Sequence, residues 1–200
     1  MQWLTRLFGK ENVKRNRSAQ VFFFNTLASA KELFISQKPG LALLYSCGPT
    51  VYSRAHIGNL RAYVFSDTIA RTLKAAGYRV RRVINITDVG HLVSDGDSGE
   101  DKMSVGAARE KTTPQAIADR YSREFIDDLS ELNIATDDIQ FPRATDYIKE
   151  QIALAKTLEE KGFAYRIKNG LAFDTSRFPE YGKLGNIDVA AQRVGARIEA

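Results

Sequence analysis

A short stretch of mostly polar residues around Gly48 carries the strongest signal for chemistry in this sequence. It occupies residues 46–55 and leads into the tetrapeptide His56-Ile57-Gly58-Asn59. A helix that begins at this tetrapeptide would offer unpaired N–H groups and a partial positive charge to a phosphate. Gly58 would let a ring or a phosphate approach the backbone, and His56 and Asn59 would add side-chain donors. Donors of this kind can hold the charge that develops in phosphoryl or nucleotidyl transfer.

The elements that must position this stretch are predicted on both sides of it. The apolar run over 41–45 precedes it and is typical of a strand. Apolar residues then recur near a 3.6-residue period from Ile57 to Ala76 and stop at Gly77, as in a helix that ends on glycine. A second strand is predicted over 80–86. Strand, helix and strand form a βαβ unit, which implies a parallel sheet whose ligands bind beyond the carboxyl ends of its strands.

The second half of the chain lacks this βαβ rhythm. It follows a polar break at 94–101 and begins with Thr113-Pro114, a pair typical of a helix start. Another helix is expected over 144–161. A hairpin is predicted over 163–175, because Asn169-Gly170 is a strong turn signal. We interpret these elements as an insertion or a second subdomain.

The composition excludes several classes of protein. With 44% hydrophobic and 26% charged residues, the 200-residue chain is unlike a disordered, collagen-like or disulfide-stapled protein. No apolar run approaches the roughly 18 residues that span a bilayer. The single cysteine, Cys47, excludes an internal disulfide, and we therefore expect a cytoplasmic protein. The net charge of +5 lies mostly in residues 1–19, which hold five basic residues and one acidic residue, so no basic stripe for nucleic acid is visible elsewhere.

Three motifs together resemble the cysteinyl-tRNA synthetases, a family of class I aminoacyl-tRNA synthetases. They are Cys47-Gly48-Pro49-Thr50-Val51-Tyr52, then His56 to Asn59, then Asn85-Ile86-Thr87-Asp88. The resemblance covers roughly residues 21–188, from Phe24-Asn25-Thr26-Leu27 to Tyr181-Gly182-Lys183-Leu184. Three motifs in order at sensible spacing are far more specific than any one of them.

The resemblance implies roles for individual residues. His56 to Asn59 matches the ATP-binding HIGH motif of the family, with Asn59 in place of the final histidine. Gly48 and Thr87 are expected to bind the amino acid substrate, and Cys47 matches the first zinc ligand. The expected ATP-binding residues are Pro49, Thr50, Tyr52, His56, Gly58 and Asn59, of which the last three are also the expected catalytic residues.

The resemblance also implies zinc as a cofactor and ATP with magnesium as a substrate. Zinc can bind the thiolate of cysteine directly and so separate cysteine from serine. The family takes its other three zinc ligands and its Lys-Met-Ser-Lys-Ser loop from beyond residue 200, and Lys102-Met103-Ser104 lies too early to replace that loop. Two alternatives concern single residues: His91 could serve as a metal ligand or as a hydrogen-bonded loop residue, and Cys47 could be a buried small hydrophobic residue.

The implied fold is an α/β, Rossmann-like parallel sheet with an α+β connective insertion. A basic and flexible extension is expected over 1–19, the half that binds nucleotide and amino acid over 20–104, and the insertion, truncated at its end, over 105–200.

The implied function is that of a cysteine–tRNA ligase. In the complete enzyme, ATP would activate cysteine to cysteinyl-adenylate, and the cysteinyl group would pass to tRNA-Cys. We expect the 200-residue chain alone to be inactive, and no obligate protein partner is evident. Two other functions stay open: a cysteine-activating amino-sugar ligase of the same superfamily, and a truncated non-catalytic paralogue that binds nucleotide or a partner protein.

Overall fold

The computed structural model describes residues 19–89, 102–167, 170–185 and 187, and the chain divides into two compact units. The first unit contains residues 34–146, and the second contains 22–33 and the part of the chain that follows 146. The predicted extension up to residue 18, the polar break at 94–101 and the alternative ligand His91 lie outside the described residues.

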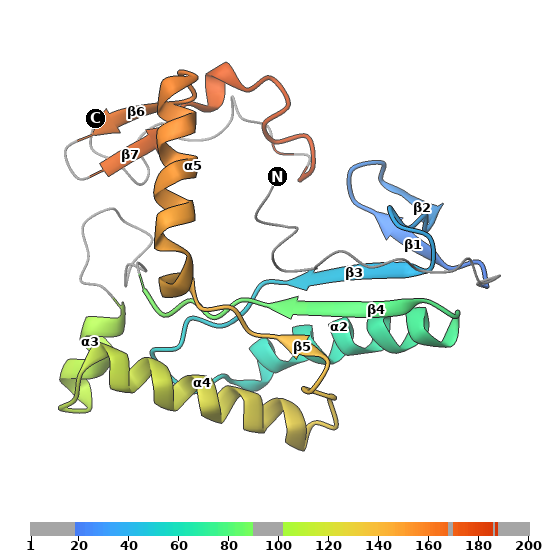
Figure 1. Ribbon diagram of the computed structural model, residues 1–200, viewed down its shortest axis with the longest axis horizontal. Helices are drawn as coiled ribbons and strands as arrows, with labels where there is room; N and C mark the ends of the chain where they lie inside the picture. Colours follow the sequence, from blue (N-terminus) through green and yellow to red (C-terminus); the bar gives the residue numbers. More distant parts are fainter. Residues whose placement is uncertain (1–18, 90–101, 168–169, 186, 188–200) are drawn as a thin grey trace. The chain divides into compact units, whose positions relative to one another are not determined.

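A three-stranded parallel sheet forms the centre of the first unit (Figure 1). Its strand order is β3 (Leu41–Ser46), β4 (Arg79–Ile84) and β5 (Ile139–Gln140). β3 pairs with β4 along its whole length, and β5 pairs with β4 at Arg82 and Val83. The predicted α/β class with a parallel sheet is confirmed.

Two long helices cover one face of this sheet (Figure 1). α2 (Ile57–Ala75) connects β3 to β4 as the periodicity predicts, and it ends before Gly77, whose φ of 88° favours glycine. α4 (Pro114–Glu131) begins at Thr113, whose hydroxyl accepts the N–H of Ala116 at 3.2 Å. Both predicted helix starts are therefore confirmed.

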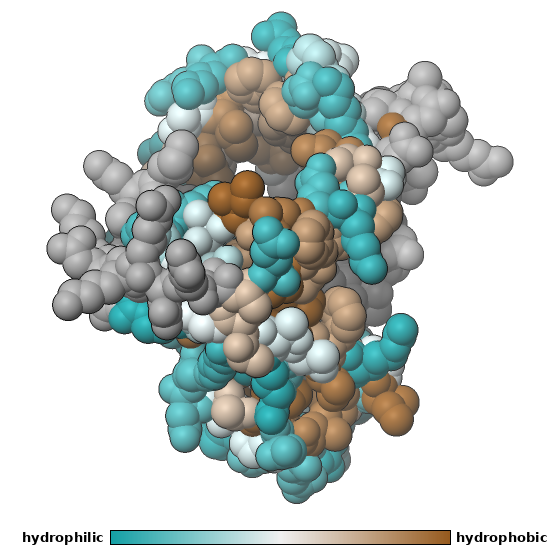
Figure 2. All heavy atoms as spheres, turned by 90° about the vertical axis from the view of Figure 1, so that its right-hand side faces the viewer, coloured by the Kyte–Doolittle hydropathy of each residue, from teal (hydrophilic) through white to brown (hydrophobic). Residues whose placement is uncertain are grey.

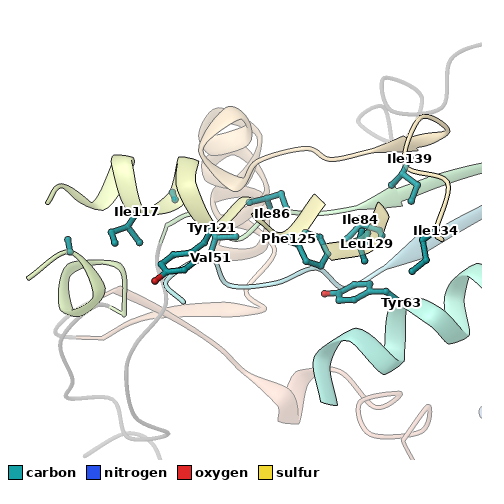
Figure 3. Packing of buried hydrophobic residues seen from close by; sticks show 12 residues of the cluster. Val51, Tyr63, Ile84, Ile86, Ile117, Tyr121, Phe125, Leu129, Ile134 and Ile139 are labelled. Atoms are coloured by element: carbon teal, nitrogen blue, oxygen red, sulfur yellow. The ribbon is translucent and has the colours of Figure 1, made fainter. Parts of the chain in front are cut away.

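The hydrophobic core lies between the sheet and these helices (Figure 3). Phe125 of α4 is 2% exposed and meets the ring of Tyr63 from α2 edge to face, with ring centroids 4.9 Å apart. The other fully or nearly buried members are Val51, Ile84, Ile86, Ala107, Ile117, Ala118, Tyr121, Leu129, Ile134 and Ile139. Val51 and Ile86 belong to the segments that leave β3 and β4, so the core supports the carboxyl edge of the sheet.

Residues 105–146 differ from the sequence prediction, because they belong to the first unit. The parallel pairing of β5 with β4 makes β4, α4 and β5 a second βαβ unit. The boundary between the two parts of the chain was expected after residue 104, but the first compact unit continues to Asp146. β5 has two residues and no apolar run of its own, so the periodicity could not reveal it. A short helix, α3 (Lys102–Arg109), also precedes α4 and was not predicted.

The second unit holds two antiparallel hairpins and a helix. β1 (Phe22–Asn25) pairs with β2 (Ala30–Leu33). β6 (Ala164–Ile167) pairs with β7 (Gly170–Phe173), which confirms the hairpin predicted over 163–175 within two residues at each end. α5 (Ile148–Glu160) begins four residues later than predicted, because Ala144–Tyr147 form a 3-10 turn. A second 3-10 turn occupies Thr175–Arg177.

Apolar side chains are exposed on the β1–β2 hairpin. Phe24 is 66% exposed, and Phe22 and Leu27 are more than half exposed. Figure 2 shows apolar residues interspersed with polar ones on the face that it draws. Among the described helices, none is long and apolar enough to cross a membrane.

A buried ion pair joins α2 to β4. Arg82 Nη1 lies 2.7 Å from Asp67 Oδ1, and the Arg82 side chain is 2% exposed. Arg71 approaches the other oxygen of the same carboxylate at 2.5 Å, but its side chain is 56% exposed. Removing one member of a buried pair is costly, whereas an exposed pair contributes little.

Arg82→Ala should therefore lower the free energy of unfolding by about 3 kcal/mol, because it leaves a cavity beside a buried carboxylate. Arg71→Ala, which removes the exposed partner of the same carboxylate, should lower it by less than about 1 kcal/mol. Urea denaturation of both variants beside the parent chain measures the difference. Equal losses would contradict the assignment of Arg82 as the stabilising partner.

Candidate active site at the carboxyl edge of the sheet

The segments that leave β3 and β4 run side by side at the carboxyl edge of the sheet. Thr87 N donates to Pro49 O at 3.0 Å, and Val51 N donates to Thr87 O at 3.2 Å. Thr50 and Thr87 form a parallel bridge, so the pairing of the two strands continues beyond their ends. Ligands of open parallel sheets bind at this edge.

Gly48 lies directly on the backbone of the neighbouring segment. A Cβ atom at this position would lie 1.4 Å from the carbonyl oxygen of Asn85, so only glycine fits. The N–H of Gly48 donates to Asn85 Oδ1 at 2.9 Å, and the hydroxyl of Tyr45 donates to the same oxygen at 3.0 Å. Asn85 Nδ2 donates to Thr87 Oγ1 at 3.1 Å. Asn85 belongs to one of the three motifs, but no role was predicted for it.

His56 begins α2 as its N-cap residue. Its Nδ1 accepts the N–H of Gly58 at 3.0 Å, and Asn59 Oδ1 accepts the N–H of His56 at 3.1 Å, which completes a capping box. Because Nδ1 is an acceptor, the proton of a neutral His56 imidazole sits on Nε2. The acceptor atoms of both side chains bind backbone N–H groups at the start of the helix. Their remaining polar atoms, His56 Nε2–H and the Asn59 amide N–H groups, are donors.

The thiol of Cys47 is exposed at the end of β3. This exposure does not fit a buried small hydrophobic residue. A tetrahedral zinc site needs about four ligands. Among the described residues, no group of three His, Cys, Asp or Glu side chains is arranged to hold a metal ion. These residues therefore do not form a zinc site by themselves, and the role of Cys47 as one ligand stays a prediction.

Two tyrosines lie near Cys47. Burial raises the pKa of Tyr63 to about 12, and the nearby Cys47 contributes further in the same direction. Burial also raises the pKa of Tyr45, again with a smaller contribution from Cys47. Both hydroxyls therefore keep their protons at neutral pH, and that of Tyr45 can donate to Asn85.

Asp88 holds the end of the segment that follows β4. Its side chain is 1% exposed and accepts three hydrogen bonds, from Arg143 Nε at 2.9 Å, Thr145 N at 3.0 Å and Thr145 Oγ1 at 2.6 Å. Arg143 also contacts Asp119 of α4 at 2.6 Å, and this hydrogen bond lowers the pKa of Asp119. The segment that contains Thr87 is thus fixed from behind.

α3 and α4 hold the loop that precedes His56. Arg54 Nη2 lies 2.6 Å from Asp128 Oδ1 of α4, so one of the two arginines that flank the tetrapeptide is already paired. Gly106 lets α3 approach the loop, because a Cβ atom there would lie 3.0 Å from the carbonyl oxygen of Tyr52. The second flanking arginine, Arg61, lines a shallow hollow together with Gly58, Ala62 and Phe65.

The structure thus brings the expected site residues to one edge of one sheet. The loop after β3 and the facing segment after β4 contain Cys47, Gly48, Pro49, Thr50, Tyr52 and Thr87, and the first turn of α2 with its cap contains His56, Gly58 and Asn59. Sequence reasoning missed Asn85 and Asp88, although Asn85 lies near the end of the strand predicted over 80–86 and Asp88 lies two residues beyond it, at the edge of the sheet where ligands bind.

Comparisons of the sequence with known proteins agree on one family. Residues 34–200 match the family described as "tRNA synthetases class I (C) catalytic domain". A protein of Zymomonas mobilis named cysteine–tRNA ligase is 52% identical over 167 residues, which cover 84% of this chain and 32% of that protein. Proteins of Burkholderia lata (cysteine–tRNA ligase 1) and Chlorobium luteolum (cysteine–tRNA ligase) are 48% and 47% identical over 88% of this chain and 37% and 36% of their own lengths. The chain spans about a third of the length of these relatives.

Gly48→Ala should lower the free energy of unfolding by about 1 to 3 kcal/mol, because the added methyl group would overlap a backbone carbonyl that cannot rotate away. Gly58→Ala is the matched control: its methyl group would meet only the movable ring of His56 at 2.9 Å, and alanine favours a helix over glycine. The control should leave the unfolding free energy unchanged or raise it, as urea denaturation would show. A comparable loss in both variants would argue against the tight packing at Gly48.

Proposed function

Because this chain belongs to the family of class I (C) tRNA synthetase catalytic domains, we propose that it forms the part of a cysteine–tRNA ligase that binds ATP and cysteine. In the complete protein, a carboxylate oxygen of cysteine would attack the α-phosphorus of ATP, pyrophosphate would leave, and the cysteinyl group would then pass to tRNA-Cys. One observation carries this proposal. The Cys47 loop, Thr87 and the His56 cap meet at the carboxyl edge of one parallel sheet, in a chain whose curated relatives bear that name.

The first turn of α2 is the proposed ATP site. Negative charge shifts onto the phosphate oxygens as the carboxylate attacks and pyrophosphate leaves. The donors of His56 and Asn59 are already fixed by their bonds to the helix, so they can stabilise this charge without rearrangement. Pro49, Thr50 and Tyr52 are the proposed further contacts to ATP. A general base is unnecessary because the attacking carboxylate is already ionised.

The loop after β3 is the proposed amino acid site. Gly48 and Thr87 would contact cysteine, and Cys47 would be one of several zinc ligands, the others coming from outside the described residues. Zinc prefers sulfur, and this preference would separate cysteine from serine. ATP with magnesium and tRNA-Cys are the other proposed substrates, and the cytoplasm is the proposed location.

The full-length product of the gene should catalyse cysteine-dependent exchange between ATP and pyrophosphate in the presence of zinc, and serine should not support exchange. The 200-residue chain alone should show none, because its described residues contain no three-ligand metal group. Transfer of the cysteinyl group to tRNA-Cys would support the tRNA ligase, and transfer to an amino sugar would support the amino-sugar ligase of the same superfamily. No exchange by the full-length protein would favour the non-catalytic paralogue.

His56→Ser in the full-length protein should lower the kcat of the exchange reaction about 100-fold, because it removes one phosphate donor. Serine can still cap the helix, so the unfolding free energy should change by less than about 1 kcal/mol. Thr68→Ala is the control on the same helix: Thr68 is exposed, and its hydroxyl donates only within the helix, to Val64 O at 2.9 Å. An unchanged kcat in His56→Ser would remove His56 from the proposed mechanism.

A further inference from the structure

The side-chain amide of Asn85 has an orientation that its neighbours impose. The N–H of Gly48 can only donate, so the amide atom that faces it at 2.9 Å must be the oxygen. The hydroxyl of Tyr45 donates to the same oxygen at 3.0 Å. The nitrogen of the amide, on its other branch, therefore faces Thr87 Oγ1 at 3.1 Å and must donate to it.

This orientation determines what the hydroxyl of Thr87 can do. A threonine hydroxyl has one hydrogen to donate and lone pairs that accept. Asn85 occupies a lone pair and leaves the hydrogen unused. Among the described residues, the Thr87 hydroxyl makes one hydrogen bond, which it accepts from Asn85 Nδ2. The hydroxyl of this half-buried residue thus has its hydrogen available for a ligand at the edge of the sheet.

We infer that Asn85 is a positioning residue that commits the Thr87 hydroxyl to donate to an anionic group of the amino acid substrate. This inference rests on the proposed function, which places cysteine beside Thr87. Only an acceptor can take the hydrogen of Thr87, so in this assignment its partner is the carboxylate or the thiolate of cysteine, whereas the ammonium group only donates. Asn85 itself does not touch the substrate in this assignment.

A purely structural role for Asn85 is the competing explanation, because its oxygen also binds Gly48 and Tyr45. Asn85→Asp separates the two roles. One carboxylate oxygen can still accept from Gly48 and Tyr45, which preserves the link between the loops. The second oxygen can only accept, so it draws the hydrogen of Thr87 toward itself and away from the substrate.

The experiment is a double-mutant cycle in the zinc-loaded full-length protein, with N85D, T87V and the double variant. Calorimetric titration measures the Kd of L-cysteine and, as an internal control, the Kd of ATP. N85D should weaken cysteine binding about tenfold or more, the size expected for a hydrogen bond to a charged group. ATP binding should change less than about twofold, since the proposed phosphate donors His56 and Asn59 belong to the start of α2 and N85D preserves the link to the Gly48 loop. In the T87V background, N85D should have little further effect, because the hydroxyl through which it acts is absent.

The outcomes distinguish the two levels of the proposal. Equal weakening by N85D with and without the Thr87 hydroxyl, or no weakening at all, would overturn the role of Asn85 while cysteine binding by the parent protein keeps the proposed function intact. A parent protein that binds no cysteine would overturn both. Cysteamine, which has the thiol but no carboxylate, identifies the acceptor: the N85D effect persists with this ligand if the acceptor is the thiolate and disappears if it is the carboxylate.

Discussion

The close contact between Gly48 and the carbonyl of Asn85 is the constraint on which the site depends. No side chain fits between these two backbones, and only because none is present can the loop after β3 continue its pairing with the segment after β4. That pairing gives Pro49 and Thr87 a common register. Without it, the two segments would diverge after the last strand residues, and the residues proposed for ATP and for cysteine would not share one edge.

Support for this edge comes from residues beyond the end of β5. Arg143 and Thr145 donate to the buried carboxylate of Asp88, and Arg54 reaches α4 through Asp128. The second βαβ unit therefore does more than extend the sheet by one short strand. It supplies α4, whose Asp128 and Asp119 bind the arginines that hold the segments after β3 and β4. The packed core that contains Phe125 makes this helix a rigid support.

The sequence predicted the first βαβ unit well because its signals are local. The apolar run at 41–45, the helical period up to Ala76 and the glycine that follows are each readable within a few residues. β5 was missed because a strand of two residues is defined by its partner and not by its own composition. Asn85 was missed for a related reason: its role depends on atoms 37 and 40 positions away in the chain. The resemblance placed the site residues, but only the structure gave their hydrogen-bond directions.

The capping box at His56 and Asn59 links the folding of α2 to the binding of its ligand. The side chains that would face a phosphate are the ones that close the first turn, so a ligand that orders them also orders the helix start, where isolated helices fray. Thermodynamic linkage then requires reciprocity: a ligand that prefers the closed turn stabilises it, and a better-closed turn binds that ligand more tightly. The affinity of the proposed nucleotide would thus depend on how stably the first turn of α2 is closed before the nucleotide binds.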